Sequence, residues 1–570
     1  MYFSLQDFSR KLEKKGLLVH VYEEVSSVLE ITEIHRRLIA EGGPAVIFHR
    51  VMQHSPVGDG GGGEKYILPM GSVVNSMRPS SMPVICNLFG TVERIALALG
   101  YNSVDGLREL GNKLSQLRNP SPPSCWGDIK KKLPMLADVM NMRSKYKRGG
   151  PCQEICYFGD KVDLYALPIQ TCWPNEPAPL ITWGMVITRR VGDAVEIDTD
   201  GIRDASSYNI GIYRLQLLSH NRLIVRWLKH RGGADHYREW QERRMQDRER
   251  KEGREEEVGR NEGDKREVGG HAKDENLGNL NSNRPKTIWS KKGTMPIAVV
   301  VGCEPSMLLS AVMPLPENMS EYNFAGLLAQ KRPNLTECLT VPMIVPSSSE
   351  IVLEGYIDLD DLEEEGPYGD HTGFYNEKEL FPVMTVTAIT TRKKPIYLTT
   401  YTGKPVDEPA ILGMALNEVF IPLIQKQFPE IVDFWLPPEA CSYRIAVVSI
   451  CKAYPGHAKR IMMGIWSFLR QFTYTKMVIV VDAGISVRNW REVMWAVSTH
   501  MDFRRDVITV DNTPIDYLDF ASSKYELGAK MGFDATTKIG SETDRKWGDP
   551  IVMDEKIIQM VDKKWSKYGF

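Results

Sequence analysis

Three stretches of this 570-residue chain gather side chains that could bind a phosphorylated cofactor, a divalent metal ion and a proton. They run from Tyr208 to Arg214, from Arg226 to Gly233 and from Glu365 to Gly373. Amide and carboxylate oxygens are hard ligands for a metal ion, arginines can bind phosphate with two hydrogen bonds, and glycines let the backbone approach a ligand closely. The chemistry therefore depends on a fold that brings distant segments to one place.

Each of these residues also has an ordinary structural interpretation when it is considered alone. Asn209 suits a turn, and a lone histidine such as His230 is usually a surface residue whose hydrogen bonds are satisfied. Residues 226–228 would fit an edge strand whose tryptophan belongs to the core. Glu365 closes the acidic run 360–365, a pattern typical of a solvated turn. Composition alone favours these interpretations.

The elements that must position these residues change in character along the chain. Residues 1–124 alternate helical and strand-like periodicity, which predicts an N-terminal α/β domain. Its first helix is expected over Ser4–Lys15, with Ser4 as the N-cap and Gly16 after its end. The other expected elements are helices over 26–41 and 91–99 and strands over 17–22 and 45–51.

The middle of the chain, residues 125–392, consists of short β-branched segments bounded by turns, which predicts a barrel or a sandwich. The expected strands are 181–189, 213–218, 223–227, 297–302, 351–357 and 381–391. Residues 393–570 change back to α/β texture, with a helix over 409–427. Apolar strands at 443–450 and 477–482, separated by a helix over 458–472, predict a parallel sheet in a C-terminal α/β domain.

A charged insertion at about 241–290 interrupts the middle domain. In residues 241–280, 22 of 40 side chains are charged, 12 acidic and 10 basic, and no apolar periodicity is present. Such a segment cannot bury enough surface to offset its ordering entropy. We expect a disordered segment or a solvated helix. An insertion without a specific function is favoured over an arm that docks a partner.

Composition restricts the classes of function. The chain is 42% hydrophobic and 25% charged, with a net charge of −2, which gives no reason to expect a nucleic-acid partner. No secretory signal begins the sequence, and its apolar runs are far shorter than the ~20 residues that cross a bilayer. We expect a cytoplasmic protein, with peripheral contact at the inner membrane left open.

Longer strings point to a family. The three stretches above resemble the UbiD family of decarboxylases, and they are most similar to its 3-polyprenyl-4-hydroxybenzoate carboxy-lyases. The resemblance runs from the first helix nearly to the last residue, without the charged insertion. It implies that the middle domain is a split β-barrel of flavin-reductase type that holds the cofactor, and that the C-terminal α/β domain closes over the active site. Further matching segments are 315–322, 349–355, 401–409 and 512–520.

The resemblance also implies the cofactors. Loss of carbon dioxide from an aromatic acid leaves a carbanion that no ordinary side chain delocalises, so a cofactor must act as electron sink. The family uses prenylated FMN, which a flavin prenyltransferase supplies, and anchors its phosphate through Mn²⁺ or another divalent cation. The matching metal positions are Asn209, Glu321 and, in part of the family, His230. The matching cofactor contacts are Ile212, Tyr213, Arg214, Arg226, Trp227, Leu228, Arg231 and Gly232.

Arg214, Glu365 and Asp370 match the catalytic arginine and the two acids of the family. Two carboxyls that converge on an apolar pocket cannot both ionise cheaply, so we expect one of them to have a raised pKa and to hold a proton. We assign Asp370 as the proton donor and Glu365 as the support of Arg214. The glycines and the proline between the two acids predict a tight, fixed backbone path.

The string from Asp370 to Gly373 matches the polyprenyl branch, whereas the branch that acts on cinnamic-type acids usually has Glu-Met-His-Gly there. The expected function is therefore the non-oxidative decarboxylation of 3-polyprenyl-4-hydroxybenzoate to 2-polyprenylphenol in ubiquinone biosynthesis. The alternatives are a decarboxylase of another aromatic acid and a non-catalytic flavin-binding scaffold. By analogy with the family, a homo-oligomer is expected.

Overall fold

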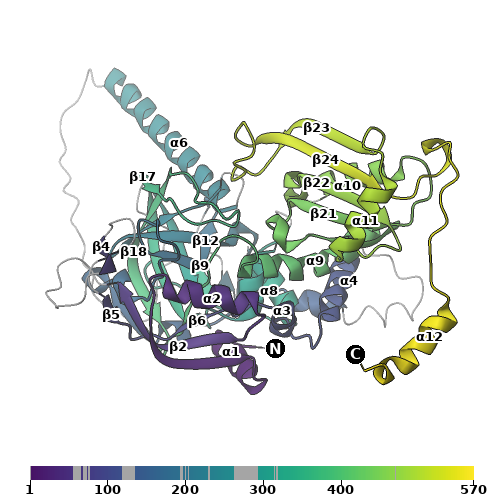
Figure 1. Cartoon of the computed structure of the whole chain (residues 1–570). Coiled ribbons are helices and arrows are strands. Elements are labelled where there is room, and N and C mark those ends of the chain that lie inside the picture. Colours follow the sequence, from purple (N-terminus) through teal and green to yellow (C-terminus); the bar gives the residue numbers. More distant parts are fainter. Residues whose placement is uncertain are drawn as a thin grey trace. The chain divides into compact units, whose positions relative to one another are not determined.

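The computed structural model describes residues 2–54, 66–67, 73–74, 77–118, 135–192, 197–198, 201–202, 205–228, 232–261, 293–313, 315, 319–468 and 470–569. The chain forms two compact units (Figure 1). One consists of Met1–Leu423 and Pro438–Ser442, and the other of Ile424–Pro437 and Tyr443–Phe570. The division into three domains at residues 124 and 392 is finer than this and stays a prediction.

The N-terminal part of the first unit has the predicted α/β elements. Helix α1 (Leu5–Lys14) begins where the Ser4 side chain accepts a hydrogen bond from the Asp7 amide, and it buries Leu5, Phe8 and Leu12. Gly16 follows it with a φ of +69°, the left-handed conformation that favours glycine. The associated sheet has the order β1 (Leu18–Ser26), β2 (Ala45–His54), β6 (Val84–Cys86) and β19 (Tyr397–Leu398), with β5 (Met77–Pro79) on β2 and helix α2 (Glu30–Ala40) between β1 and β2.

An antiparallel sheet of seven strands forms the centre of the first unit. Six of these strands close into a barrel, because β13 pairs with β18 as well as with β12. The prediction of a barrel is confirmed. The strands are β8 (Ile155–Phe158), β9 (Leu180–Arg189), β12 (Tyr208–Ser219), β13 (Arg222–Val225), β14 (Thr294–Val301), β17 (Ile351–Glu365) and β18 (Glu379–Thr391).

Strand β14 shows how the barrel is built into the core. All eight of its residues are buried, and successive side chains point to opposite faces. Ile297, Val299 and Val301 therefore join one apolar cluster, whereas Ala298 and Val300 join another. Because both faces of the strand are covered, the sequence of this segment is continuously apolar instead of alternating.

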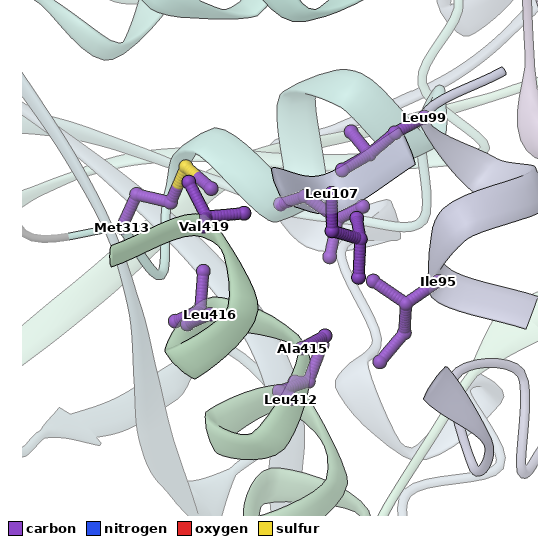
Figure 2. A pocket seen from close by; sticks show the side chains of 9 residues that line it. Ile95, Leu99, Leu107, Met313, Leu412, Ala415, Leu416 and Val419 are labelled. Carbon is purple, nitrogen blue, oxygen red and sulfur yellow. The ribbon is translucent and has the colours of Figure 1, made fainter. Parts of the chain in front are cut away.

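Helices α3 (Val92–Ala98), α4 (Asp105–Arg118), α7 (Pro305–Ser310) and α9 (Glu408–Gln427) surround a small apolar cavity. Figure 2 shows the side chains that line it, which are Ile95, Leu99, Leu107, Leu309, Met313, Leu412, Ala415, Leu416 and Val419. None of them is a candidate site residue. The remaining elements are α8 (Glu321–Ala329), the small sheet β7 (Lys145–Tyr146), β15 (Asn334–Glu337) and β16 (Ile344–Pro346), and the pairs β3 (Tyr66–Ile67) with β4 (Val73–Val74) and β10 (Ile197–Asp198) with β11 (Gly201–Ile202).

Helix α6 (Gly232–Asn261) covers the start of the charged insertion. Its first turns pack on the barrel, where His236 contacts the Thr188 hydroxyl and the Trp240 indole donates to the Arg189 carbonyl. Its later turns lead away from the barrel in Figure 1. Of the two forms that the sequence analysis expected, a disordered segment and a solvated helix, this part of the insertion has the helical one. Residues 262–292 of the insertion lie outside the described residues.

The second unit contains the predicted parallel pair. Strands β21 (Ile445–Ile450) and β22 (Met477–Asp482) pair in parallel and are joined through helix α10 (His457–Phe468). The sheet has the order β20 (Ile431–Trp435), β21, β22, β24 (Leu527–Ala535) and β23 (Val507–Pro514), accompanied by α11 (Trp490–His500) and α12 (Glu555–Lys564). Among the helices that the structure describes, none has the length and apolarity required to span a bilayer.

Candidate active site

The barrel brings together the arginine and the two acids on which the sequence analysis centred. Arg214 lies on β12, Glu365 ends β17, and Asp370 follows in the connection to β18. The Arg214 guanidinium donates to Glu365 Oε1 at 2.8 Å through Nε, and to Asp370 Oδ2 at 3.0 Å through Nη1. One cation thus bridges two carboxylates that are distant in sequence.

A second arginine shares the same carboxylate. Arg226 directly follows β13, the antiparallel neighbour of β12, and its backbone amide donates to the Arg214 carbonyl at 3.3 Å. Its Nη1 donates to Glu365 Oε2 at 2.7 Å, and the Phe381 ring lies 5.1 Å from its guanidinium carbon. Arg226 and Glu365 are both buried. Because a buried charge needs a partner, the Glu365 carboxylate helps to compensate buried Arg226 and partly buried Arg214.

The segment between the two acids follows the tight path expected from its glycines and proline. Gly366 has a φ of +94° and its amide donates to the Gln216 side chain. The Asp370 amide donates to the Phe374 carbonyl, and the Gly373 amide donates back to the Asp370 carbonyl at 2.9 Å. This turn directs the Asp370 side chain toward Arg214.

The protonation of Asp370 differs from the expectation. Burial raises the pKa of its carboxyl, but the hydrogen bond from His371 and the charge of Arg214 outweigh burial and hold the pKa well below its usual range. The expected raised pKa is therefore wrong for Asp370 in this arrangement. The carboxylate is ionised at neutral pH and needs a neighbour that supplies a proton before it can act as a donor.

Two other buried acids near this loop have raised pKa values. Burial raises the pKa of Glu176 to about 7, although the backbone amides of Trp173, Cys172 and Gly369 donate hydrogen bonds to it. Burial likewise raises the pKa of Asp407 to about 6. Neither acid was assigned a role from the sequence, although Asp407 lies in the matching segment 401–409, because an acid in an irregular segment has no periodicity that reveals its burial.

Trp173 was also missed, and it fixes the loop sterically. A Cβ atom on Gly369 would lie 2.2 Å from its indole, and one on Gly403 would lie 2.7 Å away. The indole nitrogen donates to the Thr402 carbonyl, and the Thr402 hydroxyl donates to the Gly369 carbonyl at 2.9 Å. Gly369 and Gly403 are far from Trp173 in the sequence, so only the fold shows that these three residues meet.

The candidate cofactor residues lie in the middle of β12 and just after the end of β13. Tyr213 packs edge-to-face on Trp227, and the Tyr213 hydroxyl accepts from the Gly233 amide at 3.3 Å. A Cβ atom on Gly232, the first residue of α6, would lie 2.0 Å from Asn209 Oδ1, so any other residue there would displace the Asn209 amide. The other cofactor positions with described coordinates are Ile212 on β12 and Leu228 after β13, whereas Arg231 lies outside the described residues.

Two of the three candidate metal residues are neighbours. Glu321, at the start of α8, accepts a hydrogen bond from the amide of Ile210, the residue after Asn209, at 3.1 Å through Oε2. Burial raises the pKa of Glu321 to about 7, and the Asn209 side-chain nitrogen is buried without a partner among the described residues. A buried carboxylate beside an amide is a donor set that suits a hard divalent cation. His230 lies outside the described residues, and within them no cluster of three or more His, Cys, Asp or Glu side chains could hold a metal ion.

Fold and site together define a protein built on a closed antiparallel barrel, in which two arginines form ion pairs with two acids, an arrangement that suits proton transfer to a bound molecule. Comparison with family models identifies the particular family. The N-terminal, Rift-related and C-terminal domains of 3-octaprenyl-4-hydroxybenzoate carboxy-lyase match residues 9–114, 143–252 with 263–405, and 410–535. The chain belongs to the UbiD family and is a carboxy-lyase of that family.

Solved structures agree with this assignment. The UbiD-class enzyme HmfF from Pelotomaculum thermopropionicum, in complex with FMN, is 25% identical with a TM-score of 0.66, over 96% of this chain and 97% of its own. An evolved dimeric form of it in complex with prFMN has a TM-score of 0.64 at 25% identity, with the same coverage. Vanillic acid decarboxylase from Sedimentibacter hydroxybenzoicus has a TM-score of 0.70 at 22% identity, over 100% of this chain and 99% of its own, which shows a shared fold.

Proposed function

We propose that this protein decarboxylates a 3-polyprenyl-4-hydroxybenzoate to the 2-polyprenylphenol, without net oxidation, as a step of ubiquinone biosynthesis. The observation that carries the proposal is the contact of Arg214 with both Glu365 and Asp370, at 2.8 and 3.0 Å. This contact places a cation that can hold a substrate carboxylate beside an acid that can protonate the carbon left behind.

Each residue of this network has a distinct task in the proposed reaction. Arg214 attracts and orients the substrate carboxylate. Arg226 and Glu365 keep Arg214 in place, because Glu365 accepts from both guanidiniums in a buried position. Asp370 delivers a proton to the ring carbon after carbon dioxide has left. Burial of the network excludes water and strengthens these electrostatic contacts.

The cofactor that fits this site is prenylated FMN, which when bound supplies the electron sink that the reaction needs. The Tyr213–Trp227 pair and the close approach of Gly232 to Asn209 form one edge of its proposed site. The HmfF structures contain FMN and prFMN, which supports a flavin in a relative at 25% identity. A flavin prenyltransferase would supply the cofactor.

A divalent cation, with Mn²⁺ as the first candidate, would be held by Asn209 and Glu321, and His230 is the proposed third ligand. Its task would be to tie the cofactor phosphate to the protein and to compensate the buried Glu321 carboxylate. We further propose that the protein is a homo-oligomer that works in the cytoplasm, with peripheral contact at the inner membrane to reach an apolar substrate.

The substrate class rests on the string from Asp370 to Gly373, which resembles the polyprenyl branch. The main alternative is another aromatic acid, since solved relatives with this fold act on vanillic acid and on 3,4-dihydroxybenzoic acid. The test is to reconstitute the full chain with prenylated FMN and Mn²⁺ and to offer all three acids. Release of carbon dioxide and a prenylphenol from the polyprenyl acid supports the proposal, and turnover of only the small acids contradicts it.

The second candidate is a flavin-binding scaffold without catalysis. Asp370→Asn separates the two, because an amide keeps the shape of the side chain but cannot donate the required proton. An enzyme should lose at least roughly 100-fold in kcat and retain the flavin absorbance of the wild type. A scaffold would show no turnover in either protein.

A further inference from the structure

We propose that His371 returns the proton to Asp370 in each turnover, from imidazole Nδ1 to carboxylate Oδ1. The inference rests on the proposed role of Asp370 as proton donor. Its starting point is a contact: His371 Nδ1 lies 2.7 Å from Asp370 Oδ1. This distance allows direct proton transfer without an intervening water.

The other contacts of Asp370 cannot supply a proton. Its Oδ2 accepts from Arg214 at 3.0 Å, and its Oδ1 also accepts from the backbone amide of His371 at 2.7 Å. Neither a guanidinium nor a peptide amide loses its proton near neutral pH. Among the hydrogen-bond partners of the Asp370 carboxylate that the structure describes, the imidazole of His371 is therefore the group that can give up a proton and regain it.

The turn that carries Asp370 also gives the imidazole access to solvent. The Gly373 amide closes the turn on the Asp370 carbonyl, with His371 and Thr372 between them, and Gly373 has a φ of +82°. The side chain of His371 is 23% exposed, whereas that of Asp370 is 12% exposed. The two residues thus form a short path from solvent to a mostly buried acid.

The proton balance requires such a path. When the bond from the ring carbon to the carboxylate breaks and a C–H bond forms, the enzyme consumes one proton per turnover. The N–H bond at Nδ1 of His371 breaks as an O–H bond forms on the Asp370 carboxylate, and this O–H bond breaks as the C–H bond forms, which leaves Asp370 as the carboxylate again. The imidazole then regains its proton from solvent. No electrons are gained or lost by either side chain.

The charged groups near the ring suit this role. Asp370 is in contact with it, Arg214 lies on the opposite oxygen of Asp370, and buried Asp407 acts on both His371 and Asp370 electrostatically. Lys404 packs against Gly373, where an added Cβ atom would lie 3.0 Å from the Lys404 Cβ. Two acids therefore lie near one imidazole, and one of them is in hydrogen-bond contact with it.

The first test uses His371→Asn and His371→Ala in the protein loaded with prenylated FMN and Mn²⁺. The asparagine amide can still donate a hydrogen bond to Asp370 but cannot transfer a proton. We expect kcat to fall by roughly 10- to 100-fold in both variants with KM nearly unchanged. Added imidazole and its more acidic derivatives should restore part of the rate of His371→Ala in proportion to their acidity. A fully active His371→Asn variant, or a defect that small acids do not rescue, would overturn the proposal.

The second test needs neither cofactor nor substrate, so its result is independent of the proposed function. The full cofactor-free chain is treated with diethyl pyrocarbonate, which modifies neutral imidazole, and modification of His371 is followed by peptide mass spectrometry across pH. Asp370→Asn removes the adjacent carboxylate, so the pH midpoint for His371 should fall relative to wild type. His500, which lies in the second unit, serves as the internal control. An unchanged midpoint at His371 would show that the Asp370 carboxylate does not contact the imidazole in solution, and it would overturn the proposal.

Discussion

The Nη1 atom of Arg226 lies 2.7 Å from the Oε2 atom of Glu365, where strands β13 and β17 end at the barrel. Glu365 is fully buried, and it accepts from Arg214 on its other oxygen. The candidate catalytic arginine is therefore held by an ion pair that does not itself touch the proposed proton donor. Stability and turnover should depend on this pair together.

The substitution Glu365→Gln is expected to lower both the stability of the folded protein and its turnover number. An amide cannot neutralise two guanidiniums, so buried Arg226 keeps only the exposed and more distant carboxylate of Glu379, at 3.8 Å, and the loss should approach the roughly 3–5 kcal/mol of a broken buried ion pair. Thermal unfolding of the cofactor-free protein and kcat of the reconstituted enzyme measure the two effects. Glu363→Gln is the matched control on the same strand, because Glu363 is 46% exposed and pairs with Arg222 at 3.6 Å. It should cost at most about 1 kcal/mol, and equal losses in the two variants would contradict the assignment.

Gly369→Ala is expected to impair turnover through Trp173. The new methyl group would lie 2.2 Å from the indole, which forces the loop that carries Asp370 to move. A displacement of about 1 Å at a reacting group can cost roughly 100-fold in rate. Gly413→Ala in helix α9 is the control, since nothing lies within 4 Å of its new methyl group. If Trp173→Leu in the Gly369→Ala background restores no activity, the steric explanation fails.

The pH dependence of stability should report Glu176. Its pKa is about 7 in the folded protein, raised from the ordinary value of 4.5 by burial. Below pH 4.5 both folded and unfolded states hold the proton, whereas between pH 4.5 and 7 the unfolded state loses it first, so stability falls as the pH rises. Glu176→Gln should remove this loss, up to roughly 3 kcal/mol above about pH 7. Melting temperatures of the two proteins should diverge between these two pH values, and parallel curves would refute the assignment.

Mn²⁺ should stabilise the folded protein through Asn209 and Glu321. Binding to the folded state alone raises the melting temperature with ion concentration. Asn209→Ala and Glu321→Gln should abolish that increase, and removal of the metal with a chelator should reverse it in the wild type. Glu304→Gln is the control, because Glu304 is also buried but bonds to Ser348. Retention of the Mn²⁺ response by Glu321→Gln would exclude this site.

Local elements could be read from the sequence with good accuracy. The Ser4 cap of α1, the strand–helix–strand order of β21, α10 and β22, and most barrel strands lie within a few residues of their predicted positions. These features depend on side-chain periodicity and on capping between near neighbours, both of which are written in short segments. Helix α10 ends at Phe468, short of the predicted Phe472.

The resemblance to the family predicts that Arg214, Glu365 and Asp370 belong to one site. The local properties of each segment could not have predicted that these three residues meet. The pairing of β13 with β18, which closes the barrel, joins segments far apart in the chain. Trp173 and Glu176 likewise reach the loop of Asp370 from a distant part of the sequence, and neither carries a local signal of its role.

By itself, the sequence determined the secondary-structure elements, the family and the residues that could do chemistry. The tertiary structure decided the charge states, because a pKa depends on burial and on the distance to other charges. Asp370 is the clearest case, since its type and position were evident from the sequence. Burial alone would raise its pKa, and the value is lowered instead by His371 and Arg214, which only the folded chain places at 2.7 and 3.0 Å.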